Sequence, residues 1–267
     1  MALNLDQIRN RLNSLQTTTS RTNNMYKPQP GKQVVRILPY KFADDTTVGG
    51  AFIEQYFHYD INKRTYLSPI TRGNPDPIQE FAERLKSTGS REDWNLSKKL
   101  TPKLRTFAAV VVRGEEGEGV KFWGFGKMVY EELLSILADP DYGDITDPVG
   151  GRDVQVEVKM PEETGKSYPT TTIRVKPNQT PISSDETQMK NFVENQTDMK
   201  DIFQEMSYDE LKEILQNWLN PSDDEDEKVV AKETATPTET KSTEKTTSAD
   251  TTKVTNVSDA FDELFNS

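Results

Sequence analysis

Basic and aromatic residues recur together along the first half of this 267-residue chain. The cationic candidates are Arg36, Lys63, Arg64, Lys103, Arg105 and Lys127, and the aromatic candidates are Tyr56, Tyr59, Tyr66, Trp94, Phe107 and Trp123. Cations neutralise phosphates and release counterions. Ring faces stack on unpaired bases for roughly 1–3 kcal/mol each, whatever the base. The pattern therefore predicts a sequence-tolerant site for a single-stranded nucleic acid.

Each ring taken alone has a simpler interpretation, because aromatic residues in strands usually belong to the core. Successive side chains of a strand point to opposite faces, so we expect one of Phe122 and Trp123 to face outward. Arg36 has apolar neighbours, and we expect it to reach the nucleic-acid groove from its floor.

Catalytic chemistry has little support in the sequence. The chain has no cysteine and one histidine, His58, which excludes disulfides, thiolate metal sites and cysteine nucleophiles. The segment GFGKM (124–128) is too weak a signal for a phosphate-binding loop. We expect a protein that is not an enzyme and carries no metal or other cofactor.

Charge is distributed unevenly along the chain. Residues 21–113 carry a net charge of +7 and residues 181–267 a net charge of −13, within a total of −11. The acidic end can compete with a nucleic acid for the basic half. The sequence shows no signal-peptide pattern and no apolar run long enough for a membrane span, so we expect a soluble intracellular protein.

The elements that must position these residues are mainly strands. Alternating or β-branched runs predict strands at 33–40, 51–59, 105–112, 120–126, 153–160 and 170–176, and amphipathic patterns predict helices at 76–86, at 127–137 and within 186–219. Asp76 followed by Pro77 predicts the start of the first helix, and Ser207 with Glu210 predicts a capping box in the last. Glycines at 114, 117 and 119 predict a hairpin loop between the third and fourth strands. Five or more strands with an inserted helix favour a mainly β, α+β protein with an OB-fold Greek-key barrel. A β-sandwich is the main alternative.

Three regions follow from these patterns. Residues 1–24 form a helical arm for self-association, residues 25–220 the OB-fold core, and residues 221–267 a disordered acidic tail. The arm residues expected to make the self-association contacts are Leu5, Ile8, Arg9, Arg11 and Leu12. The tail ends in an acidic amphipathic segment whose apolar residues, Phe261, Leu264 and Phe265, form a candidate partner-docking helix.

The arrangement of several segments resembles the single-stranded DNA-binding, helix-destabilising proteins of T-even-like bacteriophages. The matching segments are VVRILPYK (34–41), DPIQEF (76–81), FAAVVV (107–112), KFWGFGK (121–127) and VSDAFDELF (257–265). The resemblance implies cooperative, sequence-independent coating and protection of unwound DNA in replication, recombination and repair. It also implies recruitment of a polymerase, a helicase loader and a recombination mediator through the acidic tail, in the cytoplasm of an infected bacterial host.

This chain departs from the family pattern where a zinc site of three cysteines and a histidine is expected. DPIQ stands in place of the cysteine pair and His58 has no thiolate partner, so we expect no structural zinc and a loop held by Ile78, Phe81 and Leu85. A viral scaffold protein whose acidic tail binds basic partners and an RNA-binding OB module remain the alternative functions.

Overall fold

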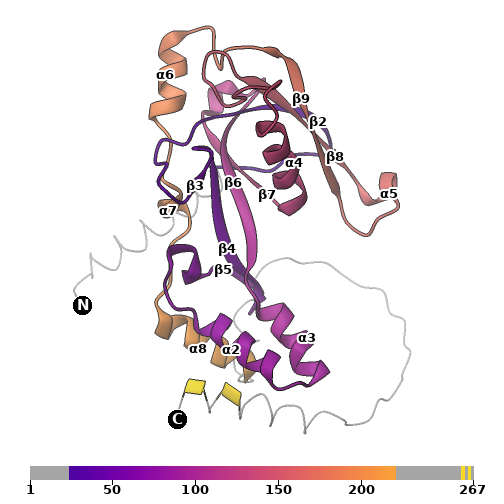
Figure 1. The fold of residues 1–267 in the computed structure, drawn as a ribbon, viewed down its shortest axis with the longest axis vertical. Helices are drawn as coiled ribbons and strands as arrows, with labels where there is room; N and C mark the ends of the chain where they lie inside the picture. The colour runs from indigo at the N-terminus through magenta and orange to yellow at the C-terminus, as the bar shows by residue number, and fades with distance from the viewer. Residues whose placement is uncertain (1–23, 221–259, 262–263, 266–267) are drawn as a thin grey trace, which may run out of the picture. The chain divides into compact units, whose positions relative to one another are not determined.

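The structure, a computed structural model, describes residues 24–220 together with residues 260, 261, 264 and 265. Over these residues it is a mixed α+β protein with nine strands in an open sheet and seven α-helices. They divide into two compact units (Figure 1). Unit 1 comprises residues 24–55 and 104–204, and unit 2 comprises residues 56–103, 205–220 and the described C-terminal residues. The expected arm helix and the acidic run 222–227 lie outside the described residues.

Unit 1 is built on strands that follow the predicted pattern. They are β1 (Met25–Tyr26), β2 (Gly31–Ile37), β3 (Thr47–Val48), the start of β4 (Phe52–Ile61), β6 (Lys103–Val112), β7 (Lys121–Phe125), β8 (Arg152–Lys159) and β9 (Thr170–Gln179). The order is β1-β7-β6-β2-β8-β9, with β1 and β7 parallel and the other neighbours in this path antiparallel. The path ends at β1 and β9, and the sheet is not closed within the described residues. The α+β class is therefore confirmed and the closed barrel is not.

The unit 1 sheet is covered on both faces at β6 and β7. Helix α4 (Lys127–Leu137) packs Val129, Tyr130 and Leu133 into the core beneath one face. On the other face, Phe107 of β6 lies 5.3 Å, ring to ring, from Phe203, which follows α7 (Met199–Ile202). The remaining helical segments of this unit are η2 (Glu116–Glu118), α5 (Pro161–Thr164) and α6 (Glu186–Glu194). Consequently most side chains of β6 and β7 are buried on both faces, whereas β8 and β9 alternate between buried and more exposed positions.

Unit 2 is mainly helical. It contains the end of β4, β5 (Arg64–Leu67), η1 (Pro69–Arg72), α2 (Pro77–Ser87), α3 (Arg91–Leu100) and α8 (Tyr208–Leu219). Asp76 accepts hydrogen bonds from the amides of Ile78 and Gln79 at the start of α2, which confirms it as the N-cap. Ser207 and Glu210 form the expected capping box at the start of α8. Helix α3 was not predicted, although Ser90 caps it in the same way.

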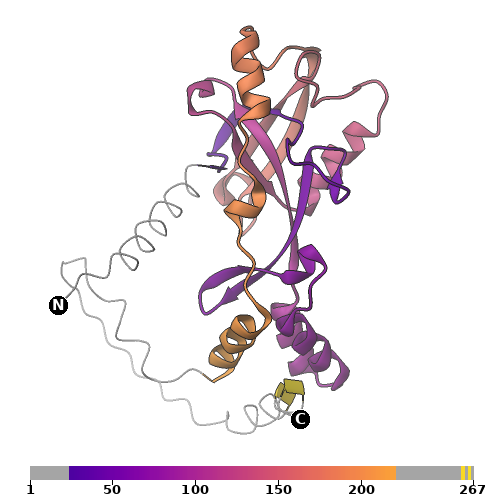
Figure 2. The same ribbon diagram turned by 90° about the vertical axis from the view of Figure 1, so that its left-hand side faces the viewer.

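The core of unit 2 joins its three helices. Ile78, Phe81 and Leu85 of α2 are at most 1% exposed, as the sequence predicted for this loop region. They pack with Leu211 and Leu215 of α8, among other apolar residues. Figure 2 shows α8 in orange and the short C-terminal turn in yellow in this part of the molecule. No helix in the described part of the chain is both long and apolar enough to span a bilayer.

Candidate nucleic-acid interface

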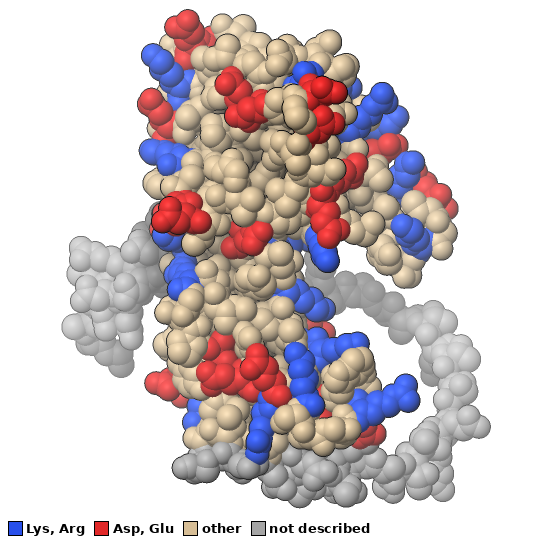
Figure 3. Space-filling model, viewed as in Figure 1, with Lys and Arg blue, Asp and Glu red and all other residues tan. Residues whose placement is uncertain are grey.

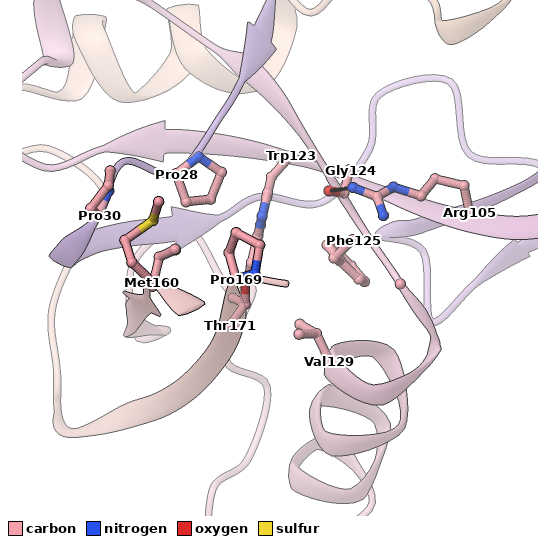
Figure 4. A pocket seen from close by; sticks show the side chains of 12 residues that line it. Pro28, Pro30, Arg105, Trp123, Gly124, Phe125, Val129, Met160, Pro169 and Thr171 are labelled. Atoms are coloured by element: carbon pink, nitrogen blue, oxygen red, sulfur yellow. Dashed lines mark hydrogen bonds between the residues drawn. The ribbon is translucent and has the colours of Figure 1, made fainter. Parts of the chain in front are cut away.

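A pocket of about 410 Å³ opens at one end of the unit 1 sheet. Residues of the β1–β2 loop, β6, β7, α4, β8 and the start of β9 line it: Pro28, Pro30, Arg105, Trp123, Gly124, Phe125, Gly126, Val129, Val158, Met160, Pro169 and Thr171. Figure 4 shows Arg105 on one side, with Pro28, Pro30 and Met160 opposite. The lining is therefore apolar and aromatic, with a single cationic side chain.

Arg105 is the predicted phosphate ligand that lies at this pocket. It is half-buried, and its Nη2 donates a hydrogen bond to the carbonyl oxygen of Gly124 at 2.5 Å. Glycine is needed at position 124 because an added Cβ would lie 2.8 Å from a ring carbon of Phe107. Phe107 and Gly124 are directly opposed across the β6–β7 pair. The Gly124 backbone thus fixes the position of the Arg105 guanidinium at the pocket.

Trp123 of β7 belongs to the hydrophobic core and also lines the pocket. Trp123 is only 1% exposed, and its ring lies 4.7 Å from that of Phe125. Phe122 is also 1% exposed and lies against Tyr40. The prediction that one of Phe122 and Trp123 faces outward is therefore wrong, and Trp123 presents no open ring face for stacking on a base. Strand alternation places the two residues on opposite faces, but both faces of the sheet are covered at β6 and β7.

Two further sequence candidates are interior residues. Phe107 is 3% exposed and lies between Gly124 and Phe203, so it presents no open face for a base. Arg36 is fully buried: its Nε lies 2.9 Å from an Asp153 carboxylate oxygen, and its Nη2 donates to Thr180. Burial lowers the pKa of Arg36, and the nearby Asp153 carboxylate opposes that change. Arg36 ties β2 to β8 and to the chain after β9, and we withdraw it as a phosphate ligand.

Side chains on the surface of unit 1 extend the pocket's chemistry. Lys127 begins α4 next to the pocket residue Gly126 and is largely exposed, with only a surface ion pair to Glu131. Tyr168 is 59% exposed beside the pocket residue Pro169, and the Lys166 amine lies 5.9 Å from its ring centroid. Sequence reasoning missed Tyr168, although an aromatic residue in the polar turn GKSYP was an available signal.

Unit 2 holds the other cationic and aromatic candidates. Lys63 and Arg64 are exposed at the β4–β5 turn, and Lys103 is exposed at the start of β6. The rings differ in exposure: Tyr59 is 37% exposed, whereas Tyr56 and Tyr66 are half-buried.

Trp94 is the most exposed of these rings. It lies on α3 at 46% exposure, with the Lys98 amine 3.5 Å from its ring centroid. Figure 3 shows Lys and Arg side chains gathered over the part of unit 2 that contains α3. The helical spacing of Trp94 and Lys98, four residues apart, brings a cation and a ring together.

His58 occupies a buried polar cluster in unit 2 rather than the interface. Its Nε2 lies 2.7 Å from an Asp76 oxygen and its Nδ1 lies 2.7 Å from the carbonyl oxygen of Leu100. Ser68 donates to the same Asp76 oxygen. Burial alone would raise the pKa of Asp76, but the hydrogen bonds from His58, Ser68 and the α2 amides together hold that pKa below its ordinary value. These partners are far apart in the sequence, and sequence reasoning identified only the capping role of Asp76.

The donors of this cluster do not suit a zinc ion of the kind that the resemblance suggested. Across residues 24–220 and the described C-terminal positions, no three His, Cys, Asp or Glu side chains are grouped so that they could hold a metal ion. His58 uses both ring nitrogens in hydrogen bonds to protein oxygens. Hydrogen bonds thus join β4, the start of α2 and the end of α3 in this region.

Of the sequence candidates, Arg105 and Trp123 line the unit 1 pocket and Lys127 lies next to it. Trp94 lies on the surface of α3 with Lys98, and the remaining exposed or half-buried candidates, Lys63, Arg64, Lys103, Tyr56, Tyr59 and Tyr66, belong to unit 2. The predicted docking residues of the C-terminus lie in unit 2, where Phe261 is 4% exposed. The self-association residues of the arm lie outside the described residues. Comparisons with models of protein families and with curated proteins give no match.

Proposed function

We propose that this protein is not an enzyme and that it binds single-stranded DNA without sequence preference, with the unit 1 pocket as the principal contact. The observation that carries the proposal is the position of Arg105 at the rim of an otherwise apolar pocket. Single-stranded nucleic acids are bound by this combination of a cation for the backbone and apolar or aromatic surfaces for the bases. Tyr168 supplies an exposed ring beside the same pocket. In this proposal unit 1 takes the part of an OB-type module.

The wider role follows from the charge pattern and the sequence resemblance. In this proposal the protein coats and protects unwound DNA during replication, recombination and repair in an infected bacterial cell. The arm (1–24) links neighbouring copies along the strand, and the acidic tail (221–267) recruits replication proteins. The exposed cations Lys63, Arg64 and Lys103 add phosphate contacts. Each phosphate contact contributes about 0.7 to the negative log–log salt slope of binding.

A titration with labelled oligo(dT), followed by fluorescence anisotropy, tests the proposal. We expect wild-type protein to bind at low salt and to dissociate as salt rises. R105A should bind more weakly, with a salt slope smaller by about 0.7, and R105K should retain the slope. R174A is the matched control, because Arg174 is an exposed arginine of β9 in the same unit and does not line the pocket.

Two further measurements separate stacking from charge and DNA from RNA. Y168A should lose about 1–3 kcal/mol of binding free energy if its ring stacks on a base. In a W94F/W218F variant, Trp123 is the one remaining tryptophan and reports on the pocket directly. Binding of oligo(dT) that is unaffected by both R105A and Y168A would refute the pocket. Tighter binding of ribo-oligomers would favour an RNA-binding module, and no binding of either polymer would favour the scaffold alternative.

A further inference from the structure

The described end of the chain packs into the helical core of unit 2. Ala260 and Phe261 are 8% and 4% exposed and belong to the apolar cluster formed by α2 and α8. The Phe261 ring meets that of Phe81 edge to face, with centroids 5.9 Å apart and planes at 70°. This is the geometry that aromatic pairs prefer. Phe261 is therefore an anchor in a site rather than a free docking residue.

A second ring extends the contact along α8. Phe265 lies 4.7 Å from Phe261 and 6.4 Å from Tyr208, again edge to face in the latter pair. The Lys212 amine lies 5.0 Å from the Phe265 ring centroid and donates a hydrogen bond to the Phe265 carbonyl oxygen at 3.1 Å. Leu264, which lies between Phe261 and Phe265 in the sequence, remains 37% exposed. The segment thus has one buried aromatic anchor, one partly buried one and an exposed residue that serves as an internal control.

The surface that receives the segment is apolar and aromatic, with one lysine at its edge. We call this the receptor surface and define it by Phe81 of α2 and by Tyr208, Leu211, Lys212 and Leu215 of α8. The C-terminal segment VSDAFDELFNS (257–267) carries three acidic residues and no basic one. Because α8 also carries Asp209, Glu210 and Glu213, packing of the rings and the Lys212 contact, rather than net charge, hold the segment.

Covalent attachment decides which copy of the segment occupies the surface. Helix α8 ends at Leu219, and the docked segment resumes at Ala260 of the same chain. Docking of a segment of the same chain is intramolecular, so its effective concentration does not depend on the protein concentration. The chain's own segment therefore has an advantage over a second copy at ordinary protein concentrations.

We propose that the receptor surface is a binding site for this chain's own C-terminal segment, and that docking in cis masks Phe261 until a competing partner displaces it. The competitor is a protein with an apolar surface edged by basic side chains, because that chemistry binds the same acidic, aromatic segment. The receptor surface and the docked residues all belong to unit 2, so their test is independent of DNA binding by unit 1.

The test uses full-length proteins and a fluorescein-labelled peptide with the sequence of residues 257–267. F261A and F265A free the receptor surface, whereas L264A leaves both anchors in place. We expect F261A and F265A to bind the peptide roughly tenfold or more tightly than wild type and L264A, which keep the surface occupied. A peptide carrying alanine at position 261 should not bind F261A. Adding K212E to F261A should weaken peptide binding.

Several results would overturn the inference. Equal peptide binding by wild type, L264A and F261A would show that the surface is not occupied in cis. No binding by either F261A or F265A would show that it is not a receptor for this segment. Light scattering gives an independent check: we expect wild type and F261A to have the same mass. A dimer that F261A abolishes would assign the surface to the segment of a second copy instead.

Discussion

Replacing Asp76 with alanine should destabilise unit 2 by about 3–5 kcal/mol, the range found when one partner of a buried ionic pair is removed. Asp76 is 2% exposed and makes four polar contacts. One oxygen accepts from the amides of Ile78 and Gln79 at 2.9 and 3.1 Å, and the other meets His58 at 2.7 Å and the Ser68 hydroxyl. Alanine removes all four acceptor contacts and leaves His58, which is fully buried, without its partner.

Asparagine at position 76 separates the two roles of the carboxylate. Its side-chain oxygen can still accept from the two α2 amides, and its NH₂ group can donate to Nε2 of a neutral imidazole. What is lost is the charge-assisted hydrogen bond, so we expect a smaller loss of about 1–3 kcal/mol. Ser90 supplies the control for capping alone, because it caps the exposed start of α3 in the same unit through the amides of Glu92 and Asp93. S90A should cost about 1 kcal/mol.

Urea denaturation provides the measurement, with the unfolding of unit 2 followed by the fluorescence of Trp94 and Trp218 in a W123F background. The pH dependence adds a second signature. The folded-state pKa of Asp76 is held below its ordinary value of 3.8, so its contribution is present above that value and is lost as pH falls through the folded pKa. D76N should lack this part of the acid destabilisation. A loss for D76A no greater than that for S90A would refute the view that the His58 cluster stabilises this unit.

Two further predictions concern the interface and the tail. G124A should cost about 1–3 kcal/mol in unfolding free energy, because its Cβ would lie 2.8 Å from the Phe107 ring. Thermal unfolding measures this loss. The control is G117A, because a Cβ added at Gly117 meets nothing within 4 Å. Neutralising the acidic run 223–227 to Asn and Gln should tighten oligo(dT) binding at low salt and have little effect at high salt, because screening removes the competition. Binding that is unchanged or weaker at low salt would contradict the competition, and this variant leaves the docked residues Phe261 and Phe265 intact.

Local signals in the sequence predicted several elements well. Asp76 followed by Pro77 predicted the start of α2, and Ser207 with Glu210 predicted the start of α8, because capping depends on residues two or three positions apart. The glycine-containing loop between two apolar runs predicted the antiparallel β6–β7 pair. Helix α3 was not predicted because its helical signals, Ser90 and the spacing of Leu96 and Leu100, are short and lie among charged residues.

The candidate site was predicted only in part. Arg105 and Trp123 were both named from the sequence, and both line the unit 1 pocket. The pocket's remaining wall comes from Pro28, Met160 and Pro169, which no periodic pattern marks. Arg36 as a phosphate ligand, and Phe107 and Trp123 as stacking residues, were misassigned because composition and alternation do not show which strand faces a second layer will cover.

The sequence by itself determined the longer strands, most of the longer helices and two of the helix caps, the opposite charge of the two halves and the apolar residues of the C-terminus. These properties depend on neighbours along the chain and on simple counts. Tertiary structure alone decided that both Phe122 and Trp123 are buried, that His58 meets Asp76 and Leu100, and that Phe261 packs on Phe81. Each of these features depends on contacts between residues 18 to 180 positions apart, or on layers packed over a sheet. The free energy of such contacts is set by shape and burial, which no local pattern encodes.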